Sequence, residues 1–277
     1  MVDKASVRAI INIFSTKNLR PAGARCVRTI FSNFFFRQYR AVFSPQKIPV
    51  FFVDHPLDAS IPFDPAKVNT YLDFVAFWLR PLGTILKKYP ETGIDPVLDF
   101  ISSMERLYRF AAEVYSRSLS TTDRPHYKAN FHFALIHALD PHLLCIPSLH
   151  VMIAVFTYTK YRKLLQSLGE EPGTEIRDGA LAITESVLYV KQHSVNCIAA
   201  ALYAMHRFDQ TLFPAEEGKH FVTDLFAGDE KLPDRDRIRN YIIELYTQFC
   251  ESGTAASMWM DPLLEFLKAM PRRSGRT

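Results

Sequence analysis

Two arginines seven positions apart form the first group of residues that could do chemistry. Arg117 and Arg124 flank a stretch rich in Ser and Thr, and Arg124 is followed by a proline. A loop in this stretch would let both guanidinium groups face one anion, and guanidinium forks match phosphate oxygens in charge and geometry. By itself, the pair predicts only a site for an anion.

A serine and a histidine at an expected helix start form the second group. Ser148 follows Pro147 and precedes an apolar stretch, so we expect it to cap the N-terminus of a helix. Its hydroxyl and the backbone N–H groups of the first turn would then face an anion at the positive end of the helix dipole. His150 would lie in that turn, where an imidazole can donate a proton to a leaving oxygen.

The third group contains a lysine and a histidine two positions apart. Lys191 would add a cation to the site, and the neutral imidazole of His193 can attack phosphorus to form a phosphohistidine. A residue four positions after a helical residue shares its face, and a nucleophilic histidine needs a carboxylate there to fix its tautomer and stabilise the imidazolium. This chain has Cys197 at that position.

In their order and spacing, the three groups resemble the signature of the type 2 phosphatidic acid phosphatase superfamily, which includes bacterial acid phosphatases and vanadium haloperoxidases. That signature reads Lys, six residues, Arg-Pro; then Pro-Ser-Gly-His; then Ser-Arg, five residues, His, three residues, Asp. The first element matches with Arg117 in place of the Lys. The second matches with Leu149 in place of the Gly, as in the inositolphosphorylceramide synthase-like branch.

The third element keeps two residues of the pattern and departs from it at two others. Ser186 and His193 have the expected spacing, whereas Val187 occupies the position of the Arg and Cys197 that of the Asp. The Lys-Gln-His run that ends at His193 resembles a variant of the synthase-like branch, in which the Lys takes the role of the missing cation.

The resemblance implies a helical bundle and a phosphatase or phosphotransferase that acts on a phosphate monoester or a lipid phosphate without a metal or other cofactor. It makes His193 the nucleophile and His150 the acid, with Cys197 at the orienting position. The residues it assigns to phosphate binding are Arg117, Arg124, Ser148, Leu149 and Lys191. The alternative is a weak or inactive relative that serves as an anion-binding or membrane-surface interaction module.

Other histidines and cysteines give weaker patterns. The spacings among His126, His132, His137 and His142 do not match a helical metal pair, so we predict no metal site. His220 and Asp224 have that spacing, but one such pair is common by chance. A Cys197–His193 nucleophilic pair is less favoured than a buried cysteine, because such pairs usually come from separate elements.

The composition predicts an all-α fold. The chain has 10 Gly against 22 Phe and 12 Tyr, and Asp-Pro pairs recur where helices would start. We expect helices near 65–88, 95–117, 127–139, 148–168, 174–191, 193–207, 215–226, 235–252 and 261–270. The one short alternating stretch is 48–53.

Nothing in the sequence predicts secretion or a membrane span. The four cysteines lack paired spacing, which favours a reducing compartment, and the first apolar run is too short for a secretory signal. No apolar segment reaches about 18 residues without interruption. We therefore expect a cytoplasmic protein that is either free or peripheral at a membrane.

The N-terminal segment differs in charge from the remainder of the chain. Residues 1–50 hold nine Lys or Arg against Asp3, which gives this segment a charge of +8. Because the whole chain has a net charge of +4, the remaining residues carry −4. We divide the chain into a basic, aromatic arm with a Pro-rich connector at 1–60 and one helical domain at 61–277. Residues 21–45 would form an amphipathic helix that either lies on anionic lipid or docks on the core, and we favour docking. No motif supports binding of nucleic acid.

Overall fold

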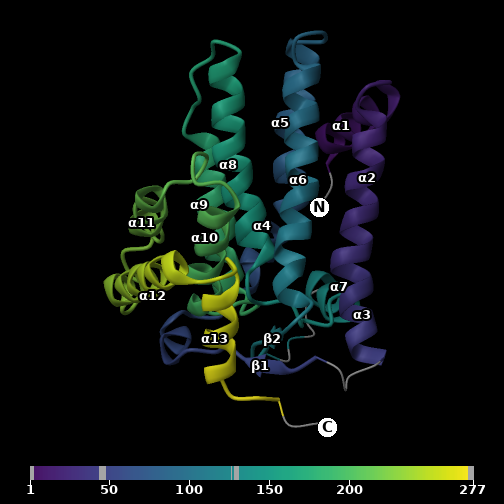
Figure 1. Cartoon of the computed structure of the whole chain (residues 1–277). Helices are drawn as coiled ribbons and strands as arrows, with labels where there is room; N and C mark the ends of the chain where they lie inside the picture. Colours follow the sequence, from purple (N-terminus) through teal and green to yellow (C-terminus); the bar gives the residue numbers. More distant parts are fainter. Residues whose placement is uncertain (1–2, 44–47, 126, 128–130, 274–277) are drawn as a thin grey trace.

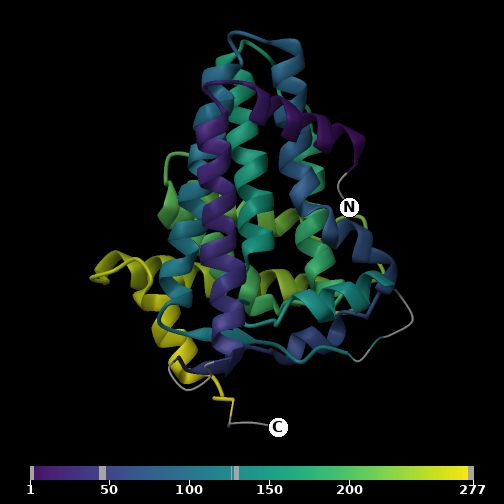
Figure 2. The same cartoon turned by 90° about the vertical axis from the view of Figure 1, so that its right-hand side faces the viewer.

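The computed structural model describes residues 3–43, 48–125, 127 and 131–273, and most of these are helical (Figures 1 and 2). The two strands within this part are each three residues long. The all-α prediction is therefore confirmed at the level of fold class.

The centre of the bundle is α8 (Leu149–Ser167), which packs against α5 (Phe74–Lys88), α6 (Ile94–Tyr115), α9 (Glu175–Tyr189) and α10 (Val195–Phe208). Every residue of α8 from Leu149 to Thr159 is buried. A helix that is enclosed on all sides must be apolar around its circumference, and this segment fits that requirement. The N-terminal end of α8 therefore lies inside the protein.

A second enclosed helix, α10, joins the bundle to the C-terminal part. Its residues from Val195 to Met205 are buried, and α12 (Arg235–Ala255) packs across it. The helices α11 (Ala215–Asp224) and α13 (Asp261–Ala269) pack against α12. Figure 1 shows this C-terminal group, coloured light green to yellow, on the side of the bundle opposite α2.

The N-terminal helices pack onto the bundle. Helix α1 (Lys4–Ser15) lies against α5, and α2 (Arg20–Ile30) lies against α6. From α2 the chain continues through a π-helical turn (Phe31–Phe35) into α3 (Phe36–Phe43). Ala9, Ile13, Leu19, Ala22 and Cys26 belong to the same buried core as the bundle helices. Within the predicted helix at 21–45, the α2 part is thus docked on the core, which is the alternative favoured from the sequence.

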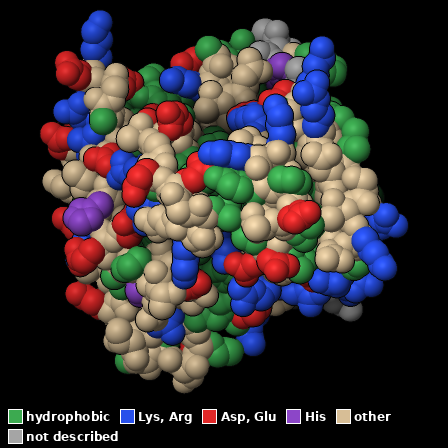
Figure 3. All heavy atoms as spheres, turned by 90° about the horizontal axis from the view of Figure 1, so that it is seen from above, with side chains coloured by type: hydrophobic (Ala, Val, Ile, Leu, Met, Phe, Trp, Pro, Cys, Tyr) green, Lys and Arg blue, Asp and Glu red, His purple; other side chains and the backbone are tan. Residues whose placement is uncertain are grey.

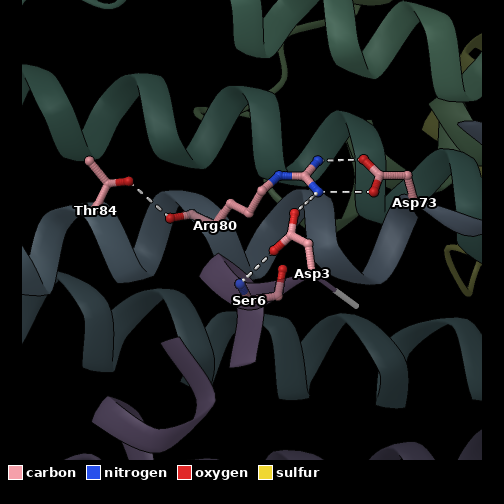
Figure 4. A network of polar contacts seen from close by, with 5 residues as sticks. All are labelled: Asp3, Ser6, Asp73, Arg80 and Thr84. Carbon is pink, nitrogen blue, oxygen red and sulfur yellow. Dashed lines mark hydrogen bonds and ion pairs between the residues drawn. The ribbon is translucent and has the colours of Figure 1, made fainter. Parts of the chain in front are cut away.

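A network of charged groups fixes the start of α1 to α5 (Figure 4). The Asp3 carboxylate accepts the backbone N–H of Ser6 at 2.8 Å, which caps α1, and also accepts a hydrogen bond from Arg80 at 3.1 Å. The same guanidinium pairs with both carboxylate oxygens of Asp73. Such a fork–fork pair is among the stronger charge-assisted contacts.

A small parallel sheet closes one end of the bundle. Strand β1 (Val50–Phe52) pairs with β2 (Leu119–Thr121) in the register Val50–Leu119 to Phe52–Thr121. Between β1 and α5 the chain makes two 3₁₀ turns (Pro56–Ser60 and Pro65–Lys67) and the short helix α4 (Val68–Leu72). Helix α7 (Phe131–Leu139) follows the first motif.

Most of the predicted helices are present, with shifted ends. The predicted helix at 65–88 is divided into a 3₁₀ turn, α4 and α5, because the chain bends at Asp73. Helix α1 and strand β2 were not predicted. Part of the predicted helix at 127–139 lies outside the described residues. None of the helices in the described ranges has the length and apolarity to span a bilayer.

The close approach of α1 to α5 depends on Gly83. A Cβ atom built there would lie 2.9 Å from the Cβ of Ala9, which is closer than real Cβ contacts allow. We expect Gly83→Leu to displace α1 and to cost roughly 1–3 kcal/mol through overpacking. Limited trypsin digestion should then cleave within α1 faster than in the wild type. Thr84→Leu, on the exposed neighbouring position, should leave the digestion pattern unchanged; equal protection of both variants would contradict this packing.

Candidate active site

The first motif positions the serine of the second. The hydroxyl of Ser120 in β2 accepts the N–H of Ile146 at 2.7 Å, and the Ser120 carbonyl accepts the N–H of Cys145 at 3.3 Å. These bonds hold the chain that leads into α8. Ser148 then caps the helix, and its Oγ accepts the N–H of Val151 at 3.5 Å.

The connector between α9 and α10 positions the histidine of the third motif. Lys191 has a φ of +55°, a left-handed conformation that reverses the chain after α9. The Val187 carbonyl accepts the N–H groups of both Gln192 and His193, at 3.0 and 3.2 Å. Ser194 caps α10. His193 is therefore held in a short turn between two buried helices.

Two histidines and a serine from separate motifs meet at this point. Ser148 Oγ lies 3.1 Å from His193 Nε2, within hydrogen-bonding distance. The ring centroids of His150 and His193 are 5.6 Å apart, at an interplanar angle of 61°. Groups at this separation lie within reach of one tetrahedral anion. The structure thus brings together the three side chains that the second and third motifs place in one site.

Both rings are held in the neutral form. His150 lies between Tyr71 and Phe74, with ring centroids 4.4 and 4.2 Å away, and burial lowers its pKa to about 3. Burial also holds the pKa of His193 well below its usual value, and the neighbouring His150 ring and Arg124 guanidinium act in the same direction. The backbone of Cys145 opposes this effect. At neutral pH each neutral imidazole therefore carries a lone pair on one ring nitrogen, and in His193 the Ser148 hydroxyl bonds Nε2.

Arg124 supplies the positive charge near these rings. Its guanidinium donates to Oε1 of Gln192 at 3.2 Å and to the carbonyl of Asp140 at 3.4 Å. Leu149 is the first residue of α8, so its backbone N–H belongs to the turn that has no acceptor within the helix. Arg124 and the N-terminal turn of α8, with Ser148 and Leu149, thus contribute positive charge and backbone donors near the two histidines.

Lys191 has a different partner from the one expected. Its ammonium donates to the carbonyl of Asp58 at 2.5 Å and to that of Ile61, both in the segment around the first 3₁₀ turn. Burial lowers the pKa of Lys191. Lys191 therefore binds two carbonyls of the segment at 58–61, a role that the resemblance did not assign to it.

Arg117 also lies apart from the histidines. Its side chain is exposed, and the guanidinium contacts the sulfur of Met258 at 3.8 Å. The strand β2 begins two residues later and carries the chain inward, so the arginine remains at the end of α6. Strand β2 thus lies within the stretch between Arg117 and Arg124, and the predicted convergence of both guanidiniums on one anion is not observed.

Cys197 does not orient His193. Its side chain is fully buried and, among the described residues, Nδ1 of His193 is buried with no hydrogen-bond partner. Burial raises the pKa of the Cys197 thiol well above its usual value, so this group is uncharged. At the position where the resemblance expects a carboxylate, the chain therefore has an uncharged thiol.

Sequence reasoning missed three neighbours of the site. Gln192 accepts from Arg124, and Asp140 accepts the N–H of His142 at 2.9 Å. The His142 ring bonds Thr122 Oγ1 at 2.7 Å and lies 6.3 Å from the His193 ring. Gln192 stands between two residues that the motif identified, which was a usable signal. His142 has no comparable signal, because its position depends on the loop before α8.

No family model matches the sequence, and the searches of curated proteins and of solved structures likewise found no match. The family resemblance therefore rests on the motif residues alone.

The buried neutral histidines should make stability depend on pH. The pKa of His150 is about 3 in the folded protein and about 6.5 when unfolded, so the unfolded state binds more protons below pH 6.5. The stability is fully present above pH 6.5 and falls as the pH drops toward 3. For His150 alone the loss at pH 5 is roughly 2 kcal/mol.

Urea unfolding at pH 8 and pH 5 measures this effect. His150→Phe, which keeps an aromatic ring between Tyr71 and Phe74, should lose less stability between the two pH values than the wild type. His220→Gln alters an exposed histidine and should lose as much as the wild type. An unchanged pH dependence in His150→Phe would show that this ring is not buried in neutral form.

Proposed function

We propose that this protein is a phosphatase or phosphotransferase that acts on a phosphate monoester or a lipid phosphate through a phosphohistidine at His193. The observation that carries the proposal is the meeting of Ser148, His150 and His193 at the N-terminal end of α8. Ser148 Oγ is 3.1 Å from His193 Nε2, and the two imidazole rings are 5.6 Å apart.

The proposed reaction has two steps. In the tautomer with its proton on Nδ1, His193 attacks phosphorus with the Nε2 lone pair; a P–N bond forms while the P–O bond to the leaving group breaks. His150 donates a proton to the leaving oxygen. Water, or an alcohol in the transferase reaction, then attacks the phosphohistidine and gives its proton to His150, which restores both rings.

Ser148 changes partners in this scheme. Without substrate its hydroxyl is bonded to Nε2 of His193; with phosphate bound it would donate to a phosphate oxygen together with the N–H groups at the start of α8. His150 needs a proton before it can act as an acid, and burial disfavours that proton. The negative charge of a bound phosphate would raise the pKa of His150 and so supply the proton-bearing form.

A second candidate is an anion-binding module without catalysis. It is supported by the buried Nδ1 of His193, which has no hydrogen-bond partner in the described part of the chain. It is also supported by the contacts of Arg117 with Met258 and of Lys191 with the Asp58 carbonyl, which engage these two cations elsewhere. A site with Arg124 as its cation and no carboxylate behind the histidine can bind an anion while stabilising the transition state poorly.

Vanadate binding tests whether the site takes a phosphate-like anion. A guanidinium that bonds an oxyanion contributes a charge-assisted contact, so Arg124→Ala should weaken binding about tenfold or more in calorimetric titration. Arg117→Ala is the matched control, because that guanidinium is exposed beside Met258. Its affinity should equal that of the wild type. Absence of binding, or equal loss in both variants, would remove the anion site from both candidate functions.

Restoring the carboxylate tests catalysis. Loss of the corresponding carboxylate costs roughly 10⁴-fold in a Ser-His-Asp site, so wild-type turnover should be low. Cys197→Asp should raise the rate on phosphomonoesters or lipid phosphates by at least about tenfold, a modest share of that effect. Some loss of stability should accompany the gain, because the added charge is buried.

Two controls isolate the charge and the nucleophile. Cys197→Asn has a similar shape without the charge and should give little gain, and the gain of Cys197→Asp should vanish when His193 is also replaced by Ala. A folded Cys197→Asp protein that binds vanadate but shows no added turnover would favour the non-catalytic module.

A further inference from the structure

Large apolar side chains are exposed along the helix that runs from α2 through the π turn to α3. They include Phe31 and Phe36, 61% and 64% exposed, and Phe43, 80% exposed. Exposure is not a sign of a loosely attached helix, because the opposite side of α2 is buried against α6. We call the exposed side the outer face; its residues are Val27, Arg28, Phe31, Phe36, Arg40, Val42 and Phe43.

A cavity lined by cations lies beside these aromatic rings. It has a volume of about 400 Å³ and is formed between α2, the π turn and α6. Three arginines line it: Arg28, Arg37 and Arg109. Ser32 and Asn33 add polar groups to its wall. The dimensions and donors fit a phosphate group with its ester substituent.

The charges of the cavity are only partly neutralised by the protein. The Glu113 carboxylate in its wall accepts the indole N–H of Trp259 at 2.7 Å, and Arg109 pairs with Glu105 at 2.5 Å. Arg37 is in a different situation: its Nε is buried with no hydrogen-bond partner among residues 3–43, 48–125, 127 and 131–273. Burial and the nearby charge of Arg40 lower the pKa of Arg37. A bound anion would satisfy both the donor and the charge.

The surrounding surface has the same sign. The described residues of the N-terminal segment, 3–43, carry eight Lys or Arg against Asp3. Figure 3 looks onto the end of the bundle where α2 begins, and there Lys and Arg side chains gather along the edge on the α2 side, with some Asp and Glu among them. A second copy of this chain would bring like charges together at this face. An anionic surface is the complementary partner.

We infer that the outer face and its arginine-lined cavity dock the protein on a membrane containing anionic phospholipid. Phe31, Phe36 and Phe43 enter the interfacial region of the bilayer, while Arg28 and Arg37 bind the phosphate of one lipid. The helix lies along the surface rather than across the bilayer. This inference does not depend on the proposed catalytic function, since none of these residues belongs to the site at His193.

Gln38 connects this surface to the candidate active site. Its side chain is buried, and its Oε1 accepts the N–H of Leu143 at 3.1 Å, in the loop that leads to Ser148. Helix α3 is therefore fixed to the same loop that β2 holds. Docking through α3 would place that loop, and the N-terminal end of α8 behind it, on the membrane side of the protein.

Vesicle sedimentation of the full-length protein tests the inference. Binding should be strong to vesicles of phosphatidylcholine with phosphatidylserine, weak to phosphatidylcholine alone, and reduced by added salt. Arg28→Gln with Arg37→Gln should weaken binding about tenfold or more, because each cation near the surface contributes substantially. Lys231→Gln with Lys268→Gln removes the same charge from exposed positions elsewhere and should change binding much less.

The aromatic contribution needs its own variants. Phe31→Gln with Phe36→Gln should reduce binding to the anionic vesicles by a comparable factor, while Ile11→Gln, an exposed position on α1, should not. Circular dichroism checks that each variant keeps its helices. Equal binding to neutral and anionic vesicles, equal effects of the Arg and Lys pairs, or a dimer that Phe31→Gln dissociates would each overturn the inference; the last would identify a second copy as the occupant.

Discussion

The constraint on which this structure depends is a group of buried imidazole rings beside the Arg124 guanidinium, with the carboxylate of Asp140 close to that cation. His142, His150 and His193 lie close together, and burial lowers the pKa of each. Buried polar groups are tolerated only when hydrogen bonds replace their hydration. Thr122, Ser148 and Gln192 provide these bonds for His142, His193 and Arg124. These bonds join the end of β2, the start of α8 and the turn before α10.

Three local features of the chain position the buried histidines and their hydrogen-bond partners. The short strand β2 holds the chain before Ser148 through Ser120, and the left-handed residue Lys191 turns the chain so that His193 faces the serine. The Asp58 carboxylate accepts the N–H of Val195 at 2.9 Å at the start of α10 and that of His55 at 2.7 Å. The site is thus assembled from the ends of helices, where unpaired backbone groups are available.

The sequence predicted the parts of the site that depend on local spacing. The cap at Ser148 could be predicted because the residue precedes a long apolar run, which is typical of a helix start. The position of His150 in the first turn follows from the same pattern. Arg117 and Lys191 were misplaced for a different reason: spacing along the chain does not reveal that β2 lies between the two arginines or that the Lys191 ammonium binds carbonyls of the segment at 58–61. The fold class followed from composition, but α1 did not, because a helix with a docked face and an exposed apolar face gives no clear signal.

The π turn at Phe31–Phe35 gives the N-terminal helix two different phases. Each residue of an α-helix rotates the chain by about 100°, whereas a residue of a π turn rotates it by less. The π turn therefore changes the angular position of every side chain in α3 relative to α2. In α2 the buried side carries Ala22, Gly23 and Cys26, whereas in α3 the buried position is taken by the polar Gln38. The continuous helix can therefore pack small residues of α2 against α6 and also place the Gln38 amide against the loop at Leu143. A regular α-helical period would not put these two sets of residues on the same side.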